Sequence, residues 1–133
     1  MAFYFKLYLT ALGVFLLIDM VWLGLVARTF YASQIGYIMT PSPNWAAAIL
    51  FYLLFILGVL VFVVLPGLRE PSLGVSLGRA ALFGLVTYAT YDLTNLATLK
   101  DWPLLLTAVD LVWGTLLTTL VSAASLFIGR RLA

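Results

Sequence analysis

Charged side chains are so sparse in this sequence that the stretches between them are long enough to cross a membrane. Four stretches with at most one charge each lie between Lys6 and Arg28, between Arg28 and Arg69, between Arg79 and Lys100, and between Asp101 and Arg130. A membrane-spanning helix needs about 20 mostly apolar residues. The pattern predicts an all-α membrane protein, a four-transmembrane-helix bundle with helices at roughly 7–26, 45–65, 79–99 and 103–128, in one integral membrane domain over residues 1–133.

Composition excludes a soluble domain and several kinds of chemistry. Charged residues make up 9% of the chain and hydrophobic residues 65%, against about 25% and 45–50% in soluble domains. The chain has no cysteine and no histidine, which removes thiol nucleophiles, iron–sulfur clusters, imidazole bases and the usual zinc ligands. We expect no metal and no cofactor. The net charge of only +2 indicates no nucleic-acid partner.

Turn-forming and basic residues mark the ends and the orientation of these helices. Ser42 or Asn44 could cap the second helix, and Pro66-Gly67 is expected to end it. The mixed segment 29–39 could form a short helix on the membrane surface or an ordered loop. Five basic residues flank one side of the predicted bundle and two flank the other, which places both termini in the cytoplasm. These are Lys6, Arg69, Arg79, Arg130 and Arg131 against Arg28 and Lys100.

Three aspartates lie inside the predicted spans, where an ionisable group costs at least about 2.5 kcal/mol on insertion scales. Asp19 lies nine residues before Arg28, Asp92 eight before Lys100, and Asp110 nine after Asp101. At a helical rise of about 1.5 Å per residue, each is roughly 12–14 Å from the boundary charge on the same side. The sequence therefore predicts a single layer of carboxyls in the outer half of the membrane.

The helical faces that carry these aspartates contain further polar and aromatic side chains. Because the third and fourth helices form a tight hairpin, Asp92 and Asp110 are expected to face each other, and they are the candidate catalytic residues. The candidate ligand-binding residues share these faces: Asp19, Trp22, Tyr88, Tyr91, Asn95 and Trp113. The second helix has no polar stripe and is expected to form a lipid-facing wall.

One short pattern occurs twice. Asp19-Met-Val-Trp22 in the first helix matches Asp110-Leu-Val-Trp113 in the fourth, and those two helices run in opposite directions. The match is consistent with an inverted repeat or with coincidence, since these residue types are common in membrane helices.

The stretch Tyr91-Asp92-Leu93-Thr94-Asn95-Leu96-Ala97-Thr98-Leu99 resembles an uncharacterised bacterial family of four-span inner-membrane proteins. The resemblance covers almost the whole chain and includes Asp19 with Trp22-Leu23-Gly24, and Asp110 with Trp113-Gly114. It implies a multi-pass protein of the bacterial cytoplasmic membrane. It implies no established activity.

Three functions remain open from the sequence. The aspartates could line a cavity that binds or transports a small ligand or protons, because closely spaced carboxyls in a poor dielectric resist ionisation; transport by so small a protein would require a homodimer. Asp92 and Asp110 could instead share a proton and act on a lipid or lipid-linked substrate. Alternatively, the protein could be an accessory subunit whose aspartates only join helices by accepting hydrogen bonds. Its one certain partner is the lipid bilayer.

Overall fold

The computed structural model describes residues 1–133 and consists of helices and connecting turns, without strands. Four helical runs are long and apolar enough to cross a membrane, which confirms the architecture predicted from the charge pattern: Ala2–Val26, Trp45–Arg69, Leu73–Thr98 and Leu104–Leu132. Helices suit lipid because they satisfy every backbone N–H and C=O group within the segment. The chain is a multi-pass integral membrane protein.

Two of the four runs contain a π-helical turn. The first run consists of α1 (Ala2–Val21) and η1 (Trp22–Val26), and the second of α3 (Trp45–Val59), η2 (Leu60–Val64) and α4 (Leu65–Arg69). The other elements are the short α2 (Phe30–Ile35), α5 (Leu73–Thr98) and α6 (Leu104–Leu132). A π turn inserts an extra residue into the helical ladder and changes the direction in which the following side chains point.

The predicted end of the second helix at 65 is wrong, because the helix continues through Pro66 and Gly67 to Arg69. Pro66 stands in the first turn of α4, directly after η2. Proline is tolerated in a first helical turn, where its missing N–H is not needed. Asn44 does cap the start of this run, since its side chain accepts a hydrogen bond from the N–H of Ala47 at 3.1 Å.

The third helix begins at Leu73, six residues before the predicted start at 79. Ser72 caps it by accepting a hydrogen bond from the N–H of Val75 at 3.3 Å. The first and fourth helices are also longer than predicted, because they start at Ala2 and end at Leu132. Charged residues thus mark where a helix leaves the hydrocarbon, whereas capping residues mark where it stops.

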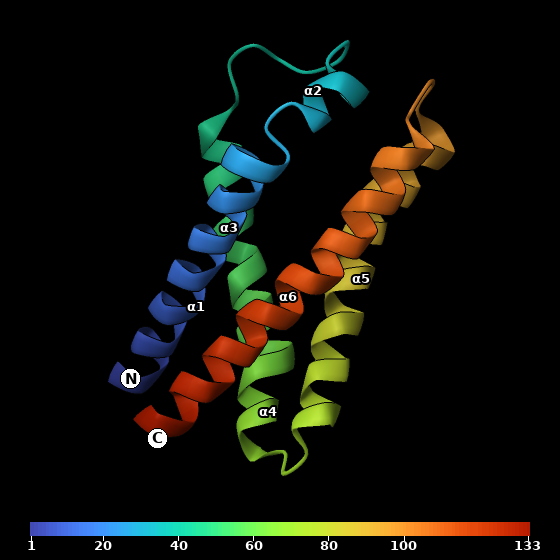
Figure 1. Ribbon diagram of the computed structural model, residues 1–133. Helices are drawn as coiled ribbons and strands as arrows, with labels where there is room; N and C mark the ends of the chain where they lie inside the picture. The colour runs from blue at the N-terminus through green and yellow to red at the C-terminus, as the bar shows by residue number, and fades with distance from the viewer.

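Helix α6 lies between α1 and α5, and both chain termini lie at the same end of the bundle (Figure 1). We call this end the terminal end, and the opposite end, which carries α2 and the α5–α6 turn, the α2 end. The apolar core joins α1, α3, η2 and α6 through these buried side chains: Leu7, Ala11, Phe15, Phe55, Ile56, Val59, Leu60, Val64, Leu117, Val121 and Leu126.

The second run is part of this core, so the expectation of a purely lipid-facing wall is wrong. Ile56, Val59 and Val63 are fully buried. The buried side chains through which this run packs on α1 and α6 are apolar, and polar side chains of those helices bond only to its backbone, as the hydroxyl of Tyr8 does to the carbonyl oxygen of Leu53 at 2.8 Å.

Helices α5 and α6 form the predicted tight hairpin. The turn between them ends at Pro103, the N-cap of α6, and contains Asp101 at a φ of 60°. The two helices approach closely where α5 carries Gly84 and α6 carries Gly114. A Cβ added to Gly84 would come within 2.5 Å of the carbonyl oxygen of Gly114. This close pairing fixes which residues of α5 face which residues of α6.

The segment after the first run contains a short helix, α2, which was one of the two expected outcomes for residues 29–39. The hydroxyl of Tyr37, just beyond α2, donates a hydrogen bond to the carbonyl oxygen of Asp101 at 2.5 Å. This bond ties the segment to the α5–α6 turn. Helix α2 lies over the end of the bundle that carries the α5–α6 turn (Figure 1).

Candidate functional site

The three aspartates predicted to share one layer are all buried. Asp19 on α1 is 6% exposed, Asp92 on α5 is 0% exposed, and Asp110 on α6 is 7% exposed. Each lies in the half of its helix nearer the α2 end. Carboxyl groups are rarely buried so completely unless they are paired or bonded. We therefore describe the partners of each one.

Asp92 and Asp110 face each other across the α5–α6 contact. Their carboxyl groups lie close enough to interact directly. Even so, neither oxygen of Asp92 has a hydrogen-bond partner of ordinary geometry in the protein. The structure thus brings together the two residues predicted as a carboxyl pair, and leaves one member of the pair without a donor.

Asp110 has a donor that the sequence analysis missed. The hydroxyl of Tyr31 on α2 donates a hydrogen bond to Oδ1 of Asp110 at 2.6 Å. The same hydroxyl accepts a hydrogen bond from Nε1 of Trp22 at 3.0 Å. Burial, and next the bond to Asp110, raise the pKa of Tyr31 above its ordinary value of 10.0. Tyr31 therefore remains a donor throughout the physiological pH range.

The two Asp-x-x-Trp segments meet in the structure. The indoles of Trp22 and Trp113 stack with ring centroids 4.3 Å apart and an interplanar angle of 10°. Asp19 lies near the indole of Trp113, while Asp110 connects through Tyr31 to Trp22. Each aspartate is thus linked to the tryptophan of the other segment. The crossed arrangement gives the repeated pattern a structural role, whatever its origin.

Tyr88 stands at the centre of the layer. Its hydroxyl lies within electrostatic range of all three aspartates and of Tyr52. Its ring lies against Gly114, so that a Cβ at that position would overlap the ring. The structure holds no group of three acidic side chains arranged to bind a metal ion.

Two further predicted ligand-binding residues lie at the rim of the layer. Tyr91 is 55% exposed, and the edge of its ring meets Trp102 at a centroid distance of 5.8 Å. Asn95 is half-buried one helical turn beyond Tyr91. Tyr91 nevertheless lies within electrostatic range of both Asp92 and Asp110. Asp92, Asp110, Asp19 and Tyr88 form the interior of the layer.

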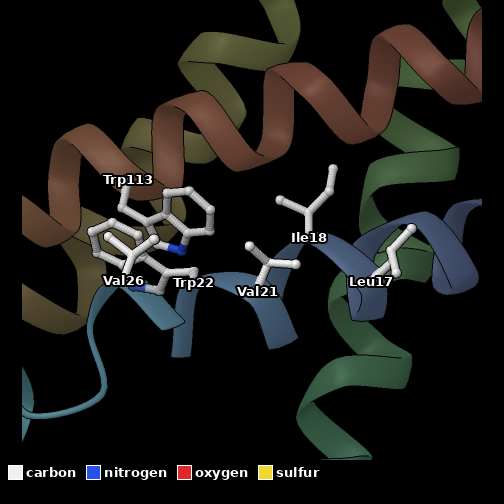
Figure 2. Close-up of a pocket in the computed structure, with 6 residues that line it drawn as sticks. All are labelled: Leu17, Ile18, Val21, Trp22, Val26 and Trp113. Carbon is white, nitrogen blue, oxygen red and sulfur yellow. The ribbon is translucent and has the colours of Figure 1, made fainter. Parts of the chain in front are cut away.

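Two apolar grooves flank the stacked tryptophans on the lipid-facing surface. The first has a volume of about 390 Å³ and is lined by Leu17, Ile18, Val21, Trp22, Val26 and Trp113 (Figure 2). The second has a volume of about 320 Å³ and is lined by Trp22, Ala108, Val109, Val112, Trp113 and Leu116. Neither groove is lined by an aspartate. These two grooves are therefore not the carboxyl-lined cavity that the sequence analysis considered, and that cavity stays a prediction.

Comparison with known proteins identifies a family but no activity. The family model described as "Predicted membrane protein (DUF2177)" matches residues 4–127. No curated protein and no solved structure matches the chain.

Proposed function

The chain belongs to the DUF2177 family of predicted membrane proteins, and from that premise we propose that it binds a proton, or a small cation in its place, at the Asp92–Asp110 pair. Within this proposal the protein lies in the bacterial cytoplasmic membrane with both termini in the cytoplasm. The α2 end, and with it the aspartate layer, then lies toward the outer surface.

The observation that carries the proposal is the unpartnered carboxyl of Asp92. This side chain is fully buried, and neither oxygen accepts a hydrogen bond from the protein. A carboxylate removed from water without a donor is very costly. The cost falls when the group takes up a proton or a cation, and a proton shared with Asp110 supplies the missing hydrogen bond directly.

A purely structural role explains Asp92 less well than it explains Asp110. Aspartates that join helices do so by accepting hydrogen bonds from neighbouring side chains. Asp110 fits this description, since it accepts a bond from Tyr31. Asp92 accepts none, so its carboxyl contributes little to helix association while the cost of its burial remains.

Infrared difference spectroscopy of the protein in lipid nanodiscs tests the proposal. We expect a carbonyl band of a protonated carboxylic acid that appears and disappears across a pH titration and is lost in Asp92→Asn. Asp92→Glu keeps the carboxyl and is expected to shift the band. Asp101→Asn, in the exposed turn, is the matched control and leaves it unchanged. A band that never titrates, or that survives in Asp92→Asn, contradicts the proposal.

A membrane-embedded enzyme is the second candidate, and the closeness of Asp92 to Asp110 favours it. Two neighbouring carboxyls can share a proton and activate water, and the grooves offer lipid chains a place on α1 and α6, the helices that carry Asp19 and Asp110. Mass spectrometry of lipids from cells that express the protein would reveal a species altered by the wild type but not by Asp92→Asn or Asp110→Asn. If both variants alter lipids as the wild type does, the enzyme hypothesis fails.

Transport would require a path through the protein, which binding alone does not require. Four helices leave little room for a path through one copy, so transport would require a homodimer. Crosslinking in native membranes distinguishes a dimer from a monomer, and a monomer restricts the proposal to binding.

A further inference from the structure

We infer that the tryptophan grooves hold the acyl chains of an anionic phospholipid whose phosphate is bound by Arg28. The inference concerns the lipid-facing surface of α1, η1 and α6. It does not depend on the titration of Asp92, so the two proposals can fail separately.

The shape and lining of the first groove match an acyl chain. All six lining residues are apolar, and they extend from Leu17 to Val26 along α1 and η1 (Figure 2). That distance is roughly 13 Å at the helical rise, close to half of the hydrocarbon thickness of about 30 Å. One chain of one leaflet therefore fits along the groove from the membrane surface to the bilayer centre.

The second groove can hold a second acyl chain. It lies along α6 and shares Trp22 and Trp113 with the first groove. The stacked indoles, which we call the ridge, thus belong to the lining of both grooves. Phospholipids carry two acyl chains on one headgroup, so a single molecule placed over the ridge fills both grooves. The large aromatic faces give each chain more contact area than aliphatic side chains would.

The positive charge of Arg28 indicates that the lipid headgroup carries a phosphate. Arg28 is exposed and lies two residues beyond Val26, at the end of the first groove nearer the α2 end. Unlike Arg130, which donates hydrogen bonds to the carbonyl oxygens of Gly67 and Glu70, Arg28 donates none to the chain. Its guanidinium is therefore free to bind a phosphate, the group that arginine recognises with paired donors.

The ridge also connects this lipid to the carboxyl layer. Nε1 of Trp22 is bonded to the hydroxyl of Tyr31, and that hydroxyl is bonded to Asp110. A lipid packed against the indole faces holds Trp22 in the position from which it supports Tyr31. Lipid occupancy and the hydrogen bonding of Asp110 are thus coupled through two contacts.

Quenching of tryptophan fluorescence by brominated lipids tests the inference. The chain has four tryptophans, so Trp45→Phe/Trp102→Phe leaves the stacked pair as the only tryptophans, which are excited selectively over tyrosine at the red edge of the absorption band. In zwitterionic bilayers we titrate phosphatidylglycerol or phosphatidylcholine with brominated chains. One cation near the surface is worth about fivefold in affinity, so half-maximal quenching is expected at about fivefold less of the anionic lipid.

Matched variants separate a site from general lipid contact. Arg28→Gln is expected to abolish the preference for the anionic lipid, whereas Lys100→Gln, at the same end of the bundle, keeps it. Val21→Phe fills the first groove and is expected to weaken quenching, whereas Leu54→Phe, exposed elsewhere, does not. Equal quenching by both lipids, or a preference that survives in Arg28→Gln, overturns the inference.

A second measurement covers the case in which loss of Trp102, which is buried and bonded to Thr107, disturbs folding. Native mass spectrometry of the unmutated protein, released from detergent with both lipids present, is expected to show retained phosphatidylglycerol. Arg28→Gln is expected to lose it and Lys100→Gln to keep it. Retention of both lipids to the same extent overturns the inference.

Discussion

At the scale of single residues, Asp110 and Asp92 face each other but differ in their hydrogen bonds. Asp110 accepts one from a side chain, and Asp92 accepts none. Their burial was predictable, because an aspartate inside an apolar span can be counted and placed by depth from the sequence alone. Their partners were not. The donor to Asp110 is Tyr31, 79 positions away on a short helix outside the spans. The direction of the Tyr31 side chain depends on how α2 lies over the bundle. Helical periodicity within the spans carries no information on that arrangement.

Tyr31→Phe tests whether this donor supports the site. The substitution leaves Oδ1 of Asp110 and Nε1 of Trp22 without their shared partner. Side-chain hydrogen bonds in membrane proteins average about 0.6 kcal/mol and reach about 1.7 kcal/mol, and two are lost here. We expect the free energy of unfolding, measured in mixed micelles, to fall by about 1–2 kcal/mol. Tyr37→Phe, which removes an exposed bond to Asp101, is the control and should cost less.

The stabilities of the wild type and of Tyr31→Phe should respond differently to alkaline pH. The pKa of Tyr31 is raised in the folded state, so above about pH 10 the unfolded chain ionises this tyrosine while the folded chain does not. The wild type therefore loses the contribution of Tyr31 as pH rises past that point, whereas Tyr31→Phe does not. A stability difference between the two that stays constant from pH 8 to pH 11 would contradict this account.

At the scale of secondary-structure elements, the four long helices could be predicted from the sequence, but the residues at which they begin and end could not. Every helix that crosses a membrane must be long enough to span its hydrocarbon core, so the four long apolar runs could be recognised by length. The ends depend on local details such as the Ser72 cap and the π turn that precedes Pro66. The burial of the second run was also missed, because apolar residues face lipid and core alike and leave no polar stripe to distinguish the two.

Gly114→Ala tests the close approach that positions the carboxyl pair. A Cβ at Gly114 would overlap the ring of Tyr88, which stands among the three aspartates. Overpacking of this kind costs about 1–3 kcal/mol, so we expect a loss of stability together with a changed carboxyl band in the infrared spectrum.

Gly13→Ala is the matched control for that substitution. Gly13 also lies inside a helix, but nothing lies within 4 Å of a Cβ placed there. Alanine is a better helix former than glycine by roughly 1 kcal/mol, so this variant should be neutral or more stable. Equal effects of the two substitutions would show that the Tyr88–Gly114 contact does not hold α5 against α6.

The whole molecule carries an asymmetry of basic residues that predicts its orientation in the membrane. Both termini and the turn between α4 and α5 lie at one end of the bundle, and α2 lies at the other (Figure 1). Five of the seven basic residues flank the terminal end. Lysine and arginine are retained preferentially in the cytoplasm, so the terminal end is expected there. If this orientation holds, the aspartate layer lies nearer the outer surface, as the proposed function requires.

Because the chain has no cysteine, single cysteines can report this orientation without background. Ser42 lies in the exposed segment before α3, and Pro71 in the exposed turn before α5, at opposite ends of the bundle. In intact spheroplasts a membrane-impermeant maleimide is expected to label Ser42→Cys and to reach Pro71→Cys only after permeabilisation. The reverse pattern would place the carboxyl layer toward the cytoplasm. Labelling of both in intact cells would mean that the copies insert in both directions, because a margin of three basic residues is too small to fix one of them.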